Sequence, residues 1–300
     1  MRKSCLIVAG VVVLIVLGCL VGLGGWFAWT RLVRPALTPE AERGHSTMRQ
    51  TGQLPEAPAV EIRVDSVSPG KAIAGWPLLV RLSVRCPLSS DAQAPKPMIL
   101  SGRNGSWHDS LQLTVEDPAR KSVEWRWRQP SSERGPMTLD GRVGLEWIWW
   151  LPGAETERIP AGKYSVKAVV DSSAVKAAEA WKGVVSSQPV SLVFEPPRQH
   201  SPEEGARKEI LNARVDSLGN NNDAAVTRLR TLLQNQPKNM EALSLAAALL
   251  ADAGKLEEAN ELYSRAIDAW YESSTKPDAE PTALLKARRE VRKRLLAQEP

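Results

Sequence analysis

The sequence is poor in the residues that most often build metal sites and disulfide frameworks. Its 300 residues include only three cysteines and three histidines, scattered along the chain. Zinc sites and disulfide frameworks need several such residues at short, regular spacings. We therefore expect no metal site, no cofactor and no disulfide-stabilised domain.

Sequence signatures of catalysis are also missing. There is no nucleophile elbow, glycine-rich phosphate loop or His-Glu-x-x-His pair. The segment Ser106-Trp107-His108-Asp109 brings three residue types of a catalytic triad together, but we expect neighbours in a loop to point apart. Cys86 lies on the apolar side of a predicted strand, which favours a small core residue over a reactive thiol. The sequence predicts a protein that is not an enzyme.

Concentrated positive charge is scarce, although the net charge is +5. Residues 1–57 and 58–200 each carry a net charge of +3, and residues 201–300 carry −1. A surplus this diffuse is unlike the basic face of a nucleic-acid-binding domain, so we expect no nucleic-acid partner.

One long uncharged run stands near the N-terminus. The 26 residues from Cys5 to Thr30 contain no charged side chain, and about 20 apolar residues are enough to cross a bilayer. A cleaved signal would have an apolar region of about 7 to 15 residues. The run therefore predicts a transmembrane helix at 5–30, after an N-terminal tail at 1–4.

Features within this run leave some alternatives open. Cys19 could be lipidated, although Leu17 fits the lipoprotein pattern poorly. Gly18 and Gly22 form a small-xxx-small pair through which two copies could dimerise. Basic residues flank both ends, so the choice of a cytoplasmic N-terminus depends on the short tail and the next domain. We expect a single-pass protein of the inner (plasma) membrane with extracytoplasmic soluble domains.

A proline-punctuated linker, 31–58, precedes a region of period-two alternation at 59–197. Seven strand-like runs predict an antiparallel β-sandwich; they begin at Val60, Val80, Leu111, Val123, Val143, Tyr164 and Val190. The segment Pro160-Ala161-Gly162-Lys163-Tyr164-Ser165-Val166 resembles bacterial immunoglobulin-like and fibronectin-like modules, in which a turn glycine precedes a corner tyrosine.

Tryptophan is the one abundant aromatic residue, with eleven against three tyrosines and two phenylalanines. Trp125 and Trp127 share one face of a predicted strand, as do Trp147 and Trp149 of another. Such rows could stack on a sugar or a peptide, but alternation with charged residues favours core positions. We expect the exposed tryptophans to be Trp150 and Trp107.

A helical pattern occupies the C-terminal residues, 203–298. The segment 240–269 places Ala246, Ala247, Gly254 and Tyr263 where tetratricopeptide repeats place their small, turn and aromatic residues, and a shift of 34 residues reproduces part of this pattern. The resemblance implies helical hairpins that bind proteins along a groove made by their first helices. Carried onto this chain, the groove candidates are Arg207, Arg214, Glu241, Ser244 and Ala248.

The last predicted helix, from Thr282 to about Gln298, holds one concentrated group of basic residues. Its apolar residues are expected to cap the repeats, which leaves the basic face exposed to solvent or to an anionic lipid or acidic partner. The basic residues are Lys286, Arg288, Arg289, Arg292, Lys293 and Arg294.

These observations together predict a membrane-anchored, non-enzymatic scaffold or adaptor of the bacterial cell envelope that binds protein partners of unknown identity. The alternative is an extracytoplasmic sensor that binds a glycan or peptide through exposed tryptophans.

Overall fold

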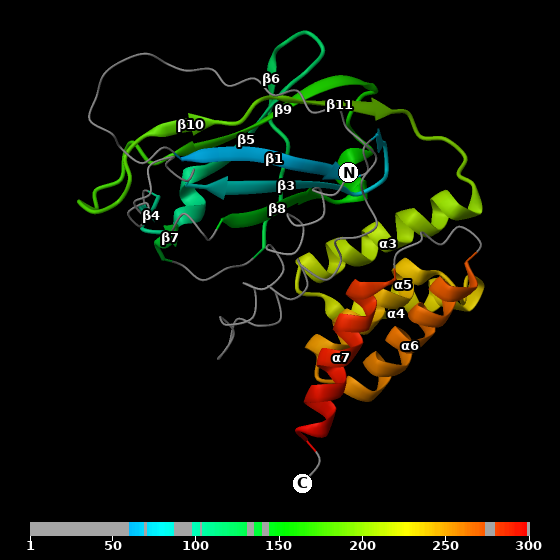
Figure 1. Cartoon of the computed structure of the whole chain (residues 1–300). Helices are drawn as coiled ribbons and strands as arrows, with labels where there is room; N and C mark the ends of the chain where they lie inside the picture. The colour runs from blue at the N-terminus through cyan, green and yellow to red at the C-terminus, as the bar shows by residue number, and fades with distance from the viewer. Residues whose placement is uncertain are drawn as a thin grey trace, which may run out of the picture. The chain divides into compact units, whose positions relative to one another are not determined.

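The computed structural model describes residues 60–68, 71–86, 98–102, 104–130, 135–139, 144–273 and 280–298. They fall into two compact units, one ending at Arg228 and the other beginning at Leu229. The division lies inside helix α4 (Asn222–Asn235). Along the chain, a β-rich region is followed by a helical region (Figure 1).

The predicted fold class is corrected in its first element, the transmembrane helix. No helix in the described ranges is long and apolar enough to cross a membrane. Helices α3 and α6 have 17 residues each and carry charges on their exposed sides. The predicted tail, span and linker, with Cys19 and the Gly18–Gly22 pair, lie outside the described residues; they are the segments 1–4, 5–30 and 31–58.

The β-rich region contains two main sheets, which form separate layers in Figure 1. The smaller sheet is antiparallel, with the order β1 (Glu61–Ser68), β3 (Leu78–Arg85) and β8 (Leu145–Leu151). The larger has the order β2-β11-β9-β5-β6, with β10 also paired to β9; its strands are β2 (Ala72–Ile73), β11 (Val190–Glu195), β9 (Gly162–Asp171), β5 (Leu111–Glu116), β6 (Ser122–Val123) and β10 (Val184–Ser186).

Two details depart from the predicted antiparallel arrangement of seven strands. Strand β2 pairs in parallel with β11. A third small sheet joins β4 (Met98–Leu100) to β7 (Met137–Leu139). Of the seven predicted runs, only the one at 123–127 fails to form a strand along most of its length, because regular pairing there ends with β6 at Val123.

The two sheets pack their apolar faces against each other. Val80, Leu82 and Trp147 of the smaller sheet share a buried cluster with Leu111 and Val170 of the larger one. A second cluster near the other end of the sheets includes Leu78, Val166, Leu192 and Phe194. Residues such as Val67 and Leu113 contact both clusters, so the core is continuous between the layers.

Tyr164 occupies the corner position that the sequence predicts for it. Its hydroxyl donates a hydrogen bond to the carbonyl oxygen of Pro160, 2.9 Å away. Gly162 is required nearby, because an added Cβ would lie 2.9 Å from Cγ of Pro118. The phenol thus connects the entry of β9 to the preceding turn, while its ring is buried in the core.

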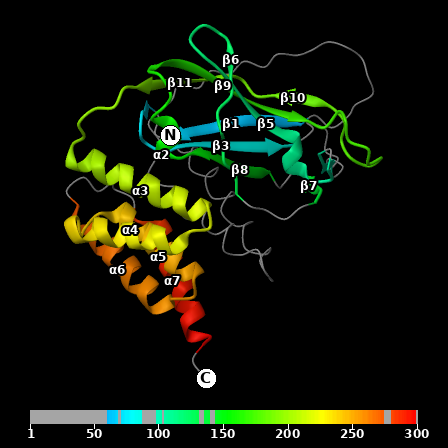
Figure 2. The same ribbon diagram turned by 180° about the vertical axis from the view of Figure 1, so that it is seen from behind.

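Short helical turns and longer helices complete the structure. The turns are η3 (Trp107–Ser110) and α2 (Gly153–Thr156). The longer helices are α3 (Pro202–Leu218), α4, α5 (Met240–Asp252), α6 (Leu256–Glu272) and α7 (Thr282–Leu296); Figure 2 shows them from behind. Helix α3 begins with a capping box, since Ser201 accepts from the Glu204 amide and the Glu204 carboxylate accepts from the Ser201 amide.

Helices α5 and α6 form a closely packed hairpin. Gly254, with φ of +77°, supplies the left-handed turn between them. Ala246, Ala259 and Ala266 are fully buried, and residues this small let two helices approach closely. Helix α5 is apolar nearly all round, so most of its side chains are buried.

Candidate partner-binding surfaces

The tryptophans expected to be exposed are buried, so that prediction is wrong. Trp107 is 4% exposed and Trp150 is 3% exposed. Strand β8 has buried residues on both of its faces, so alternation does not bring Trp150 to solvent. The backbone N–H and C=O of Trp150 are also paired with Arg128.

The two predicted tryptophan rows contribute to the core. Trp147 and Trp149 are buried, and Trp125 and Trp127 are half-buried against the second cluster. The Trp125 ring lies 5.2 Å from the ring of Tyr164 and packs edge-on against Phe194. These contacts leave no row of open rings on the described β surface, which agrees with the favoured interpretation of the sequence.

Ser106 and His108 contact each other, contrary to the expectation that neighbours would point apart. Ser106 Oγ lies 2.8 Å from His108 Nδ1 because the η3 turn folds the segment back on itself. The His108 ring stacks against Trp107 and Trp147, and this burial lowers the pKa of the imidazole. Ser106 is itself buried. The pair therefore lies in a loop that packs against the core.

The groove residues implied by the repeat resemblance are only partly at the surface. Arg214 and Ala248 are buried, which corrects their assignment to an open groove. Arg207 is exposed, whereas Glu241 and Ser244 are half-buried, with the Ser244 hydroxyl donating to the Glu241 carbonyl at 3.0 Å. Because α5 is buried on nearly every side, it cannot supply most of an open binding face.

An open cleft lies instead between α4 and α6. Its volume is about 470 Å³. Leu233 is buried and Leu262 half-buried, so the two provide an apolar base. The polar lining consists of Arg230, Gln234, Glu258, Glu261 and Arg265. The family resemblance points to first helices, so this cleft is not among the sites predicted from the sequence; the charged residues beside Leu233 and Leu262 are the signal that the sequence offers.

Charged side chains fix the two helices beside this cleft. Arg230 of α4 pairs with Glu258 of α6 at 2.5 Å. Arg265 donates to the carbonyl oxygen of Pro237, 3.4 Å away. Glu261 has no ion pair within the described ranges, so its carboxylate and the Arg265 guanidinium present opposite charges at the cleft.

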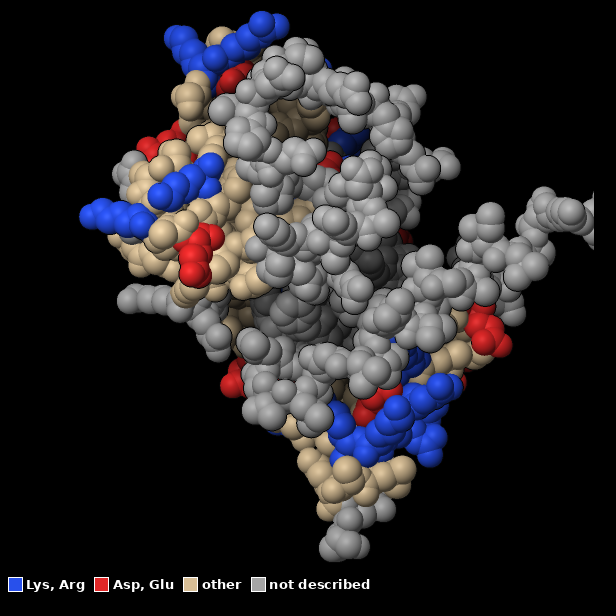
Figure 3. All heavy atoms as spheres, turned by 60° about the vertical axis from the view of Figure 1, so that its left-hand side comes forward, with Lys and Arg blue, Asp and Glu red and all other residues tan. Residues whose placement is uncertain are grey.

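The six predicted basic residues of α7 fall into two groups. Arg288 donates to Asn260 at 3.2 Å, and Arg294 donates to the carbonyl oxygen of Ala251 at 2.9 Å. The remaining four are exposed; they are Lys286, Arg289, Arg292 and Lys293. Figure 3 shows a group of basic side chains, in blue, near the lower end of the view, with acidic side chains, in red, beside them.

Among the described residues, no group of three or more His, Cys, Asp or Glu side chains could hold a metal ion. Cys86 is buried in the first core cluster, as expected for a small core residue.

No family model matches this sequence, and no curated protein matches it. Solved structures similar to it include the filamin domain of Lin-41, with 15% identity and a TM-score of 0.22 over 45% of this chain and 91% of that domain. Another is a family 123 glycoside hydrolase from Clostridium perfringens, with 9% identity and a TM-score of 0.24 over 48% of this chain and 28% of the enzyme. A DUF4466 family protein from Parabacteroides merdae has 9% identity and a TM-score of 0.18, over 45% of this chain and 44% of that one. A filamin domain is therefore one of the solved structures to which the chain is similar. The chain also has a helical C-terminal region.

Proposed function

We propose that this protein is a non-enzymatic scaffold or adaptor that binds a segment of a partner protein in the cleft between α4 and α6. The observation that carries the proposal is the combination in this cleft of an apolar base with charged walls. Binding sites commonly combine apolar contact area with a few polar groups that fix orientation.

The charges of the cleft define the partner segment. Arg230 is already paired with Glu258, so the charged groups left to contact a ligand are Glu261 and the part of the Arg265 guanidinium that does not bond to the Pro237 carbonyl. The complementary segment has an apolar side chain, which packs on Leu233 and Leu262, flanked by a basic and an acidic residue. Opposite charges on the two sides would fix the direction in which the segment lies.

The architecture of the helical region supports a binding role. The hairpin of α5 and α6 has the buried alanines, the turn glycine and the buried Tyr263 that tetratricopeptide repeats have at these places. We assign the region to a tetratricopeptide-like fold, in which the second helices rather than the first carry the open surface. The corner hydrogen bond of Tyr164 similarly supports an immunoglobulin-like β region.

The alternative of a glycan sensor has little support, because the tryptophans it requires are buried or half-buried. The proposed adaptor role requires no catalytic group.

Selection from a random peptide library displayed on phage tests the cleft with the full chain. We expect the selected peptides to share an apolar residue flanked by opposite charges. Leu262→Ala should weaken their binding about tenfold, since losing part of an apolar contact costs about 1.4 kcal/mol. Peptides selected on the Arg265→Glu variant should no longer carry the acidic flanking residue, because the guanidinium that it would contact is replaced by a carboxylate.

Val193→Ala is the matched control, because Val193 is 43% exposed on β11 and lies outside the cleft. It should leave the binding of the peptides unchanged. Equal weakening by Leu262→Ala and Val193→Ala, or selected peptides without a shared pattern, would contradict the proposal.

A further inference from the structure

Helices α6 and α7 carry opposite charge although they pack side by side. Helix α6 has five acidic residues and one basic residue, and α7 has six basic residues and one acidic residue. Ala287 and Val291 are the buried side of α7. Both helices therefore bury an apolar side in the helical region and present a charged side to solvent.

The contacts of α7 show that it runs antiparallel to α6. Arg294, near the end of α7, reaches Ala251 at the end of α5, just before α6 begins. Arg288, about one and two-thirds turns earlier in α7, reaches Asn260, which lies further along α6. Asn260 and Arg288 thus mark the seam between the two helices.

The acidic stripe of α6 lies on one side of this seam. Residues in an α-helix advance by about 100° each. Measured from Asn260, Glu257 lies about 60° round the helix, Asp268 about 80° and Glu261 about 100°. All three are exposed and have no ion pair among the described residues. Glu258 and Glu272 are instead paired with Arg230 and Lys238.

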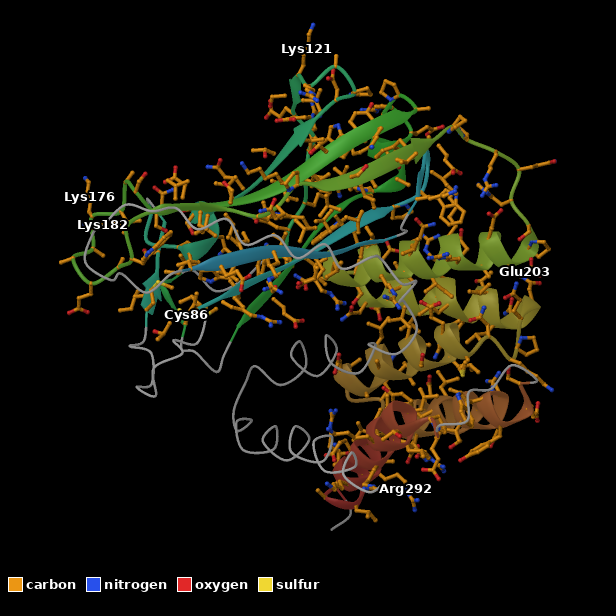
Figure 4. All side chains as sticks on the ribbon, turned by 45° about the horizontal axis from the view of Figure 1, so that its top comes forward. Cys86, Lys121, Lys176, Lys182, Glu203 and Arg292 are labelled. Atoms are coloured by element: carbon orange, nitrogen blue, oxygen red, sulfur yellow. The ribbon has the colours of Figure 1, made fainter. Side chains whose placement is uncertain are left out.

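The basic stripe of α7 lies on the same side of the seam. Measured from Arg288, Arg292 lies about 40° round the helix, Arg289 about 100° and Lys286 about 160°. On both helices these angles are measured from the seam residue in the direction of increasing residue number. Because the helices are antiparallel and their seam residues face each other, equal rotations lead to the same side, so both stripes lie on one outward surface. Lys286, Arg289 and Arg292 are without an ion pair in the described ranges, and Figure 4 shows Arg292 on α7.

We propose that this surface pairs with the same surface of a second copy of the chain. Rotation by 180° about an axis that lies in the interface, parallel to the two helices and midway between them, places the acidic stripe of each copy against the basic stripe of the other. Such an interface is isologous, since every contact occurs twice. The stripes extend about 16 Å on α6 and about 9 Å on α7, so several ion pairs form together.

The chemistry of the pairing predicts a strong dependence on salt. Exposed ion pairs are individually weak and are screened as ionic strength rises. The association is therefore a reversible one that needs several pairs at once.

Cross-capture between two differently tagged copies of the full chain tests the proposal. A non-ionic detergent is present throughout, because it leaves charge contacts intact. We expect capture at about 50 mM salt and a loss of at least about fivefold at about 500 mM salt. Capture that is absent at low salt, or equal at both concentrations, would overturn the proposal.

Charge reversal gives the decisive comparison. The basic-stripe variant is Lys286→Glu with Arg289→Glu and Arg292→Glu, and the acidic-stripe variant is Glu257→Lys with Glu261→Lys and Asp268→Lys. Each variant alone should fail to capture a copy of itself, because both of its stripes then have one sign. A mixture of the two variants should restore capture, because each stripe again meets its opposite.

The matched control reverses three exposed lysines of the β-rich region, Lys121, Lys176 and Lys182, which Figure 4 labels. This variant has the same change in net charge as the basic-stripe variant and should retain capture. Circular dichroism should show that all variants keep their helical signal. Failure of the mixture to restore capture by folded variants would overturn the proposal. Binding of the basic stripe to anionic vesicles without self-capture would also overturn it.

Discussion

The β-rich and helical regions use their chemically distinctive residues in opposite ways. In the β-rich region, tryptophans lie between the sheets, where Trp147 is 2% exposed and Trp107 is 4% exposed. In the helical region, alanines fill the interior and the charged side chains lie at the surface. An abundant residue type is thus no guide to a binding site. The contrast places the candidate recognition surfaces on α4, α6 and α7.

The largest expected effect comes from the tryptophan core. Trp147→Ala should lower the free energy of unfolding of the β-rich unit by about 3–5 kcal/mol, because it removes a large buried ring and leaves a cavity. Denaturant unfolding followed by tryptophan fluorescence measures this change. The larger part of the helical circular dichroism, which comes from α5, α6 and α7 of the other unit, should retain its transition. Equal shifts of both signals would contradict the separation between the units.

A smaller effect is expected from overfilling the alanine interior. Ala266 is fully buried in α6, so Ala266→Leu forces added atoms into a closely packed seam. We expect a loss of about 1–3 kcal/mol, seen in the helical circular dichroism transition. Leucine at exposed Asp268 serves as a control for helix propensity. Tolerance of leucine at position 266 would show that the seam is loosely packed.

The corner tyrosine tests one hydrogen bond within the β-rich region. Tyr164→Phe removes the hydroxyl that donates to the Pro160 carbonyl and keeps the ring. The expected loss is about 1 kcal/mol in thermal or denaturant unfolding followed by fluorescence. An unchanged stability would mean that the ring alone holds the corner.

The smallest expected effect is a dependence of helical stability on pH. Burial raises the pKa of Asp252 to about 6, although nearby Arg294 opposes the shift. The folded state therefore holds this proton more tightly than the unfolded state, and its contribution to stability falls as pH rises from about 4 to about 6.

Asp252→Asn should remove this dependence. Relative to the unmodified chain, the variant should gain stability between pH 4 and pH 7, on the order of a few tenths of a kcal/mol because the side chain keeps contact with solvent. Helical circular dichroism during thermal unfolding measures the gain. A relative stability that is constant across this range would contradict the raised pKa.

The sequence predicts an element well when the element is long and only one of its faces is buried. Strand β9 alternates buried and half-buried residues from Tyr164 to Asp171, so its period is visible in the sequence. Strands β2, β4, β7 and β10 have two or three residues each, too few to establish a period. The exposure of Trp150 was predicted wrongly because β8 is covered on both faces.

The candidate site was harder to predict than the fold. Helical pattern identified α5 and α6, but the burial of Ala248 depends on tertiary packing that covers α5. Arg230 and Glu258 form an ion pair beside the cleft between α4 and α6. They lie on different helices, so the periodicity of a single helix does not predict that they meet. The sequence identifies the basic residues of α7, whereas their division into seam and surface groups depends on the contacts of Arg288 and Arg294.

Site-specific photo-crosslinking tests most directly whether recognition belongs to the helical region. A photoreactive amino acid would replace Gln234, which lines the cleft, or Val184, which is 60% exposed on β10. In cells that naturally contain the protein, we expect a discrete crosslinked partner from position 234 and none from position 184. A partner crosslinked from position 184 alone would contradict the account.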